Sequence, residues 1–226
     1  LLNPELPPAR LRQIQDILQA PYILTDEEHR AAAQEIFPSA AVLLAEELGE
    51  GPIREDALAG VRSRMVDTDP LYGMFTSGST GVPKGVVVSH GSVIDFINTF
   101  TALFQIREDD VIGNQAPFDF DVSVKDIYSA LKTGAALSII PKPLFSRPKD
   151  LLDWLCDREI TTMIWAVSAL CLISTFHGLD YRRPQAVRKI LFSGEVMPLK
   201  HLRVWMEHLP EAQFVNLYGP TEITCN

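Results

Sequence analysis

Short apolar runs alternate along this chain with longer segments whose apolar residues recur every three or four positions. The pattern predicts a strand at 111–116, a helix at 122–131 that ends near Gly134, and a strand at 135–140 before Pro141. Further strands are predicted at 22–24, 41–44, 71–75, 86–88, 160–165, 188–192 and 213–217. Because alternation of strand and helix is typical of parallel pairing, we expect an α/β fold with mostly parallel sheets flanked by helices.

Polar segments follow four of these strands at the point where each strand ends. They read TSGSTG after residues 71–75, FDFDVS after 111–116, SGE after 190–192 and YGPTE after 214–217. In parallel α/β sheets, ligands bind beyond the carboxyl ends of the strands. One such turn would carry little weight, but four that the topology can place along one edge predict a ligand site.

The first of these polar segments belongs to the ten residues 76–85, TSGSTGVPKG. Glycines let a backbone turn its N–H groups inward, hydroxyls add donors, and Lys84 supplies a positive charge, so the loop is suited to a polyphosphate. It is not a P-loop sequence, because Pro83 precedes Lys84 and Gly85 follows it. On composition alone, a mobile connection between two strands is the alternative. The residues concerned are Thr76, Ser77, Gly78, Ser79, Thr80, Gly81 and Lys84.

Composition and charge exclude several functional classes. The 226 residues carry a net charge of −9 and no basic run, which argues against a nucleic-acid surface. No apolar stretch approaches the roughly 20 residues that span a bilayer, so we expect no membrane insertion and a cytoplasmic location. The cysteines Cys156, Cys171 and Cys225 are odd in number and lack a CxxC spacing, so neither a disulfide framework nor a zinc site is predicted.

Two carboxylates and one aromatic residue of the polar segments have both a functional and a structural interpretation. Asp121 can cap the helix predicted at 122–131, or it can form a pair with Asp119 for a cation or a substrate ammonium group. Glu222 is a hard oxygen ligand suited to Mg²⁺, or an exposed turn residue. Tyr218 can stack on an adenine, or it can belong to the core, as aromatic residues at strand ends often do.

Three motifs in this order resemble those of adenylate-forming enzymes: TSGSTGVPKG, FDVS and NLYGPTE. That family includes acyl-CoA synthetases, luciferases and the adenylation domains of nonribosomal peptide synthetases. The segments NQAPFDFDVSVKDIY and LFSGEVMPL are especially similar to the D-alanine:carrier protein ligases. The resemblance runs from Asn3 to Cys225.

The resemblance implies an ATP-dependent ligase that also uses Mg²⁺. The substrate carboxylate would attack the α-phosphorus, release pyrophosphate, and then pass as an acyl group to the phosphopantetheine thiol of a carrier protein. Thr76 and Lys84 would act on the phosphates, Glu222 would hold magnesium, and Asp121 would pair with the amino acid's ammonium group. Residues 76–81 and Lys84 would bind ATP together with Gly194, Glu195, Asn216, Leu217, Tyr218, Gly219, Pro220 and Thr221. Ser193, Leu217 and Cys225 would line the side-chain pocket.

Two positions depart from the D-alanine ligases, which carry cysteine where Ser193 stands and an uncharged residue where Lys125 stands. Lys125 lies four residues after Asp121, so an ion pair along one helix face is one interpretation. If it enters the pocket instead, it can neutralise an acidic substrate, as in some glutamate-activating domains. D-alanine or another small amino acid is favoured, and an acidic or other amino acid is the alternative.

Two other functions stay open from the sequence. An acyl-CoA or aryl-acid ligase is one, although an aspartate at position 121 favours a substrate with an amino group. A noncatalytic nucleotide-binding module is the other. The family's hinge and mobile C-terminal domain have no counterpart after Cys225, so we expect residues 1–70 to end a first subdomain and residues 71–226 to form the phosphate-loop and substrate-pocket subdomain. Such a fragment is expected to have little or no adenylation activity alone.

Overall fold

The structure is a computed structural model that describes residues 1–76 and 83–225. Its internal contacts divide the chain into two compact units, Leu1–His90 and Gly91–Asn226. The predicted subdomain boundary at residues 70 and 71 concerns the whole protein and stays a prediction.

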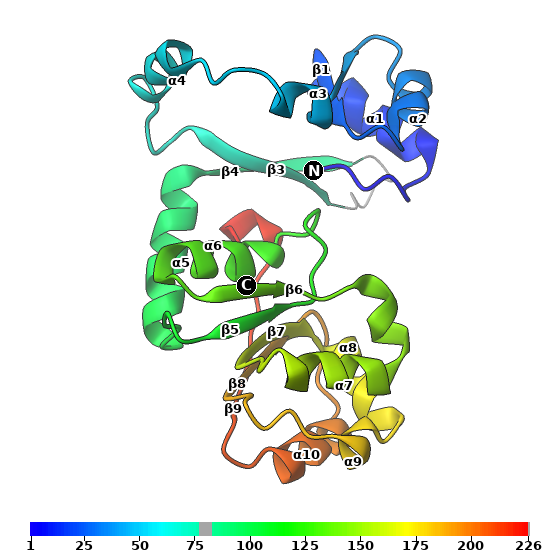
Figure 1. Cartoon of the computed structure of the whole chain (residues 1–226), viewed down its shortest axis with the longest axis vertical. Coiled ribbons are helices and arrows are strands. Elements are labelled where there is room, and N and C mark those ends of the chain that lie inside the picture. The colour runs from blue at the N-terminus through cyan, green and yellow to red at the C-terminus, as the bar shows by residue number, and fades with distance from the viewer. Residues whose placement is uncertain (77–82, 226) are drawn as a thin grey trace. The chain divides into compact units, whose positions relative to one another are not determined.

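The first unit contains two small sheets and their helices (Figure 1). Strands β1 (Tyr22–Thr25) and β2 (Ala41–Leu44) pair in parallel, whereas β3 (Pro70–Thr76) and β4 (Lys84–Ser89) pair antiparallel. A small core of Leu11, Ala33 and Phe37 lies beneath the first pair. The helices are α1 (Pro8–Leu18), α2 (Arg30–Ile36), α3 (Ala45–Gly49) and α4 (Glu55–Arg62).

The second unit is built on a parallel sheet with the strand order β6-β5-β7-β8-β9. The strands are β5 (Val111–Asn114), β6 (Ala136–Ile139), β7 (Thr162–Ala166), β8 (Lys189–Ser193) and β9 (Gln213–Asn216). Around them lie α5 (His90–Leu103), α6 (Ser123–Thr133), η1 (Lys142–Ser146), α7 (Pro148–Asp157), α8 (Val167–Thr175), α9 (Gly178–Tyr181), α10 (Leu199–His208) and η2 (Thr221–Ile223). The predicted α/β class is confirmed in this unit.

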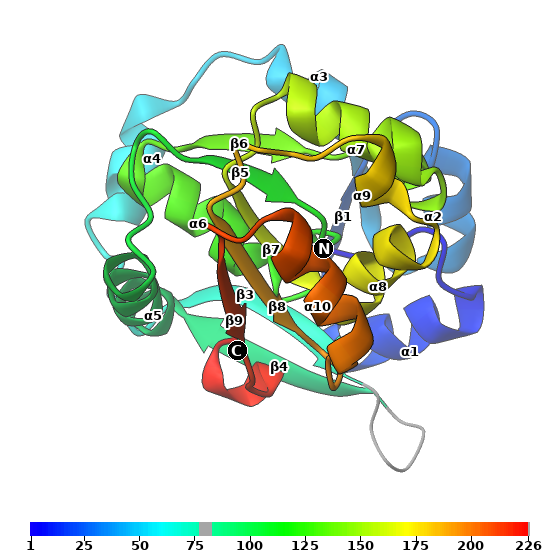
Figure 2. The same ribbon diagram turned by 90° about the horizontal axis from the view of Figure 1, so that it is seen from below.

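Alternate residues of the central strands face two separate cores. On β7, Trp165 packs into a cluster with α7, α8 and α10, whereas its neighbour Ile164 packs into a cluster with α5 and α6. On β8, Phe192 and Leu191 divide between the same two clusters. Each cluster contains helices, so helices lie on both sides of the sheet (Figures 1 and 2). Because both faces are covered, the strands are apolar on both sides.

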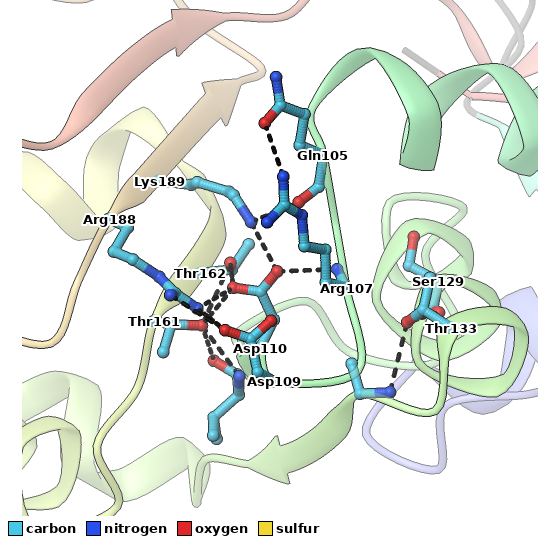
Figure 3. A network of polar contacts seen from close by, with 12 residues as sticks. Gln105, Arg107, Asp109, Asp110, Ser129, Thr133, Thr161, Thr162, Arg188 and Lys189 are labelled. Atoms are coloured by element: carbon cyan, nitrogen blue, oxygen red, sulfur yellow. Dashed lines mark hydrogen bonds and ion pairs between the residues drawn. The ribbon is translucent and has the colours of Figure 1, made fainter.

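A buried carboxylate joins the amino ends of three strands in this sheet (Figure 3). Asp110 precedes β5 and is 1% exposed. Its oxygens accept hydrogen bonds from Lys189 Nζ at 2.5 Å, Thr161 Oγ1 at 2.7 Å and Thr162 Oγ1 at 3.1 Å. The backbone N–H of Arg107 adds a bond at 3.0 Å. These donors hold the pKa of Asp110 well below its usual range, although burial acts in the opposite direction.

No helix among the described residues combines the length and the apolar character that crossing a bilayer requires.

Candidate active site

A cavity of about 320 Å³ opens at the carboxyl ends of β5, β7 and β8, and we call it the strand-end cavity. Its walls are mainly apolar, and a few polar groups lie among them, as is usual for small-molecule sites. The lining residues are Gln115, Ala116, Pro117, Phe120, Val122, Ala166, Ser193 and Gly194. Parallel strands place all their carboxyl ends at one edge, and two of the four polar segments, FDFDVS and SGE, contribute lining residues to this cavity. The segment TSGSTG follows β3, which pairs antiparallel with β4 in a separate sheet, so the expectation of four segments along one sheet edge is not met by the strand pairing.

Polar contacts fix the walls of the strand-end cavity to one another. The backbone N–H of Ala166, at the end of β7, donates to Gln115 Oε1 at 3.1 Å. One residue earlier on β7, Trp165 Nε1 donates to the carbonyl oxygen of Gly113 at 2.7 Å. The ends of β5 and β7 are therefore joined by two side chains in addition to the strand ladder.

A second cavity of about 360 Å³ adjoins the ends of β8 and β9, and we call it the Tyr218 cavity. Tyr218 is 93% exposed, so the alternative that places it in the core is wrong. Gly194 lines both cavities and has φ of +95°, a left-handed conformation that favours glycine. A side-chain atom added there would meet nothing within 4 Å, so a flat ring can approach this backbone closely. The other lining residues are Glu195, Val196, Asn216, Leu217 and Gly219.

Asp121 lies in the turn between β5 and α6. Its sequence neighbours Phe120 and Val122 both line the strand-end cavity. Helix α6 begins at Ser123 and has Val122 at its cap position, with no side-chain cap bond. The capping interpretation of Asp121 therefore gains no support. A carboxylate at this place is beside the cavity wall and near the start of a helix.

Lys125 is fully buried on α6, so a pair with Asp121 along the helix face would lie in the interior. Burial lowers the pKa of Lys125, whereas Cys225, Asp126 and Asp121 favour its charged form. Cys225 is also buried, and its Sγ donates to the carbonyl oxygen of Asp121 at 3.4 Å. Three predicted substrate residues, Asp121, Lys125 and Cys225, are thus brought together from segments a hundred residues apart. Ser193 lines the strand-end cavity, and Leu217 lines the Tyr218 cavity.

The residues predicted to bind phosphates and metal lie in both units. Thr76 and Lys84 are paired across β3 and β4, so the two ends of the predicted phosphate loop are held by a strand ladder. Ser77, Gly78, Ser79, Thr80 and Gly81 lie outside the described residues. Glu222 is exposed on η2. The part of the chain that is described holds no cluster of three or more His, Cys, Asp or Glu side chains suited to a metal. One protein carboxylate is a typical ligand set for a Mg²⁺ ion whose other ligands are phosphates and water.

Sequence reasoning missed most of the apolar wall of the strand-end cavity. Gln115, Pro117, Phe120 and Ala166 were not singled out, although three of them belong to the segment NQAPFDFDVS. Ala166 is apolar, and no polar residue directly beside it marks a site. Only its position at the end of a predicted strand could have identified it as a lining residue.

A buried carboxylate on α6 makes stability depend on pH. Burial raises the pKa of Asp126 to about 7, although a bond from Asn114 and the charge of Lys125 act in the opposite direction. An acid whose folded pKa is raised stabilises the fold below its unfolded pKa of about 3.9, and this contribution is lost as the pH rises through 7. The wild type should therefore lose stability between pH 4 and pH 8, and Asp126→Asn should not. We expect the free energy of unfolding of Asp126→Asn, minus that of the wild type, to increase by on the order of 3 to 4 kcal/mol over this range.

Urea unfolding of both proteins at several pH values measures this difference. The variant Asp95→Asn is the control, because Asp95 is an exposed aspartate on α5. Parallel pH profiles for the wild type and Asp126→Asn would contradict the prediction.

The chain matches the family model of AMP-binding enzymes over residues 1–226. It therefore belongs to the AMP-binding enzyme family, and the family predicted from the three motifs is confirmed.

Similar proteins include ligases for two different amino acids. A D-alanine–D-alanyl carrier protein ligase from Bacillus cytotoxicus is 39% identical over 162 residues, which are 70% of this chain and 31% of that protein. The corresponding ligase from Staphylococcus aureus is 29% identical over 99% of this chain and 44% of its own length. An L-proline–[L-prolyl-carrier protein] ligase from Pseudomonas fluorescens is 36% identical over 68% of this chain and 31% of that protein. The chain thus spans less than half the length of these relatives.

Solved structures share the fold of the whole chain. The crystal structure of IdnL7 is 29% identical with a TM-score of 0.82, covering 99% of this chain and 46% of that one. McyG A-PCP complexed with phenylalanyl-adenylate is 20% identical with a TM-score of 0.82, covering 100% of this chain and 37% of that one. At 20% identity, the second likeness concerns the fold alone.

Proposed function

We propose that the full-length protein activates an amino acid with ATP and transfers the aminoacyl group to the phosphopantetheine thiol of a carrier protein. Membership of the AMP-binding enzyme family supports the first step, and the names of the similar ligases support the second. The observation that carries the proposal is the pair of cavities that meet at Gly194, one beside Asp121 and one beside Tyr218. A small amino acid and a nucleoside fit such adjoining sites.

Asp121 gives the strand-end cavity its preference for an amino acid. A carboxylate attracts an ammonium group strongly where water is partly excluded, and Asp121 is partly buried. An acid without an amino group would offer the carboxylate of Asp121 no ammonium group to bind. The presence of Asp121 therefore favours amino-acid activation over the acyl-CoA and aryl-acid alternatives.

The reaction in this proposal is attack of the substrate carboxylate on the α-phosphorus of ATP, with pyrophosphate as the leaving group. Thr76 and Lys84, at the two ends of the predicted phosphate loop, would donate to the phosphates and stabilise charge that develops during the attack. Tyr218 offers an exposed ring on which adenine can stack. When Mg²⁺ is bound, Glu222 would hold it, and the ion would neutralise phosphate charge. Positioning and charge stabilisation, with no proton transfer, account for this step.

D-alanine is the proposed substrate, because several of the similar proteins are ligases for it. One observation favours a second candidate, an acidic amino acid. Lys125 is fully buried near Asp121 and Cys225, where a rearranged ammonium group could meet a substrate carboxylate. A cytoplasmic location and loss of activity in the separate chain also remain predictions.

Amino-acid-dependent exchange of labelled pyrophosphate into ATP tests the proposed function. The full-length protein is assayed with D-alanine, L-alanine, L-proline, L-glutamate and L-aspartate, with the 226-residue chain beside it. We expect the highest exchange with D-alanine and little or none from the chain alone. Exchange that is greatest with glutamate or aspartate would assign Lys125 to the substrate. Absence of exchange with every amino acid would leave a noncatalytic module or an acyl ligase.

A further inference from the structure

Helix α6 presents a buried carboxylate to the end of β5. Asp126 is fully buried, and Asn114, the last residue of β5, is 4% exposed. Asn114 Nδ2 donates to Asp126 Oδ2 at 2.6 Å and to the carbonyl oxygen of Ala116 at 3.1 Å. Both hydrogens of this amide nitrogen are therefore used, one toward the helix and one toward the turn that follows the strand.

The turn held by Asn114 forms one wall of the strand-end cavity. Ala116 lines that cavity, and so does Gln115, whose side chain accepts a bond from the backbone of Ala166 on the opposite wall. Two consecutive residues thus connect the turn after β5 to its surroundings. The Gln115 side chain joins the turn to β7. The Asn114 side chain joins it to α6.

A purely structural role explains Asp126 poorly. Its Oδ1 has no hydrogen-bond partner among the described residues, and a fully buried carboxylate with one unsatisfied oxygen is costly. Apolar side chains of similar volume would hold a helix on a sheet equally well or better. What they cannot supply is an acceptor that fixes the orientation of the Asn114 amide.

We propose that Asp126 is a positioning residue, which acts through Asn114 on the turn that forms one wall of the strand-end cavity. Its effect on substrate binding rests on the proposed function, whereas its effect on the turn does not. Without the acceptor, one N–H of the Asn114 amide is left buried and unsatisfied, and the amide can rotate away from Ala116. The turn then loses its tie to α6, and the cavity wall becomes less ordered. Among the described residues, Lys125 is the titratable side chain that acts on Asp126, so protonation of Asp126 changes both its attraction to Lys125 and the strength of the bond from Asn114.

Amide hydrogen exchange, followed by mass spectrometry on the full-length protein, tests the effect on the turn. Asp126→Ala removes the acceptor, Asp126→Asn keeps an oxygen acceptor without the charge, and Asp95→Asn is the exposed control. We expect faster exchange in Asp126→Ala at residues 114–122, by about tenfold, the loss expected for one hydrogen bond. Asp126→Asn and the control should stay close to the wild type at pH 6. Between pH 6 and pH 8, exchange corrected for its intrinsic rate should change in the wild type and stay constant in Asp126→Asn.

Steady-state kinetics then test the effect on substrate. We expect Asp126→Ala to raise KM for the activated amino acid about tenfold, with kcat within about twofold of the wild type. Asp126→Asn should restore KM. Two results would overturn the proposal: unchanged exchange at residues 114–122 in Asp126→Ala, or faster exchange spread evenly over the second unit. A protein that activates no amino acid would contradict the proposed function alone, because the exchange experiment needs no substrate.

Discussion

Asp110→Ala is expected to lower the free energy of unfolding by about 3 to 5 kcal/mol, the range for removing one partner of a buried ion pair. The side chain of Lys189 is only 12% exposed and would lose its carboxylate partner. The hydroxyls of Thr161 and Thr162 would lose an acceptor in the same place. The amino ends of β5, β7 and β8 would therefore separate more easily. Urea unfolding at pH 7 measures the loss.

The neighbouring residue provides the control for this experiment. Asp109 is 61% exposed and pairs with Arg188 at the surface, so Asp109→Ala should cost no more than about 1 kcal/mol. The pKa of Asp110 is held below its ordinary value in the folded protein. Its contribution is therefore present above the unfolded pKa of about 3.9 and is lost as the pH falls below it. Equal losses for the two variants at pH 7 would contradict the role assigned to Asp110.

Asp121→Ala is expected to reduce kcat/KM for the amino acid by about 100-fold to 1000-fold, because a charge-assisted contact to the substrate ammonium is lost. Most of the change should be in KM, since the contact exists before and during the reaction. Asp119→Ala is the matched control. It removes a carboxylate two residues away, and we expect kcat/KM to stay within about threefold of the wild type. Pyrophosphate exchange with the full-length protein measures both.

A second readout separates ammonium recognition from general damage. The wild type should prefer alanine to propionate strongly, and Asp121→Ala should lose most of that preference. Loss of activity with the preference retained would show that Asp121 acts on the fold and not on the substrate.

Periodicity was sufficient to predict the fold class, because strands and helices of the second unit carry their own apolar patterns. It did not predict where strands end. The strand expected at 111–116 ends at Asn114, where the side-chain amide bonds to the carbonyl oxygen of Ala116. It also did not distinguish the hairpin of β3 and β4 from the parallel strands around it. Such contacts depend on side chains and pairing partners that no local pattern contains.

The candidate site was predictable where polar residues follow strands and not where burial decides the outcome. Gly194 and Tyr218 lie at a cavity, as strand-end residues should. In contrast, residues 107–110 are all charged, yet the last of them, Asp110, is buried. Lys125 is another case, because it is fully buried and one of the groups that favour its charged form, Cys225, lies a hundred residues further along the chain. Tertiary packing determines both.

The most direct test of the central claim is pyrophosphate exchange by the full-length wild-type protein with D-alanine and with propionate, which differ only in the amino group. If Asp121 selects an amino acid, D-alanine should support exchange at least 100-fold better than propionate, the difference expected when a partly buried charge loses its partner. Equal exchange with both compounds would contradict amino-acid activation and would assign the strand-end cavity to an acyl substrate.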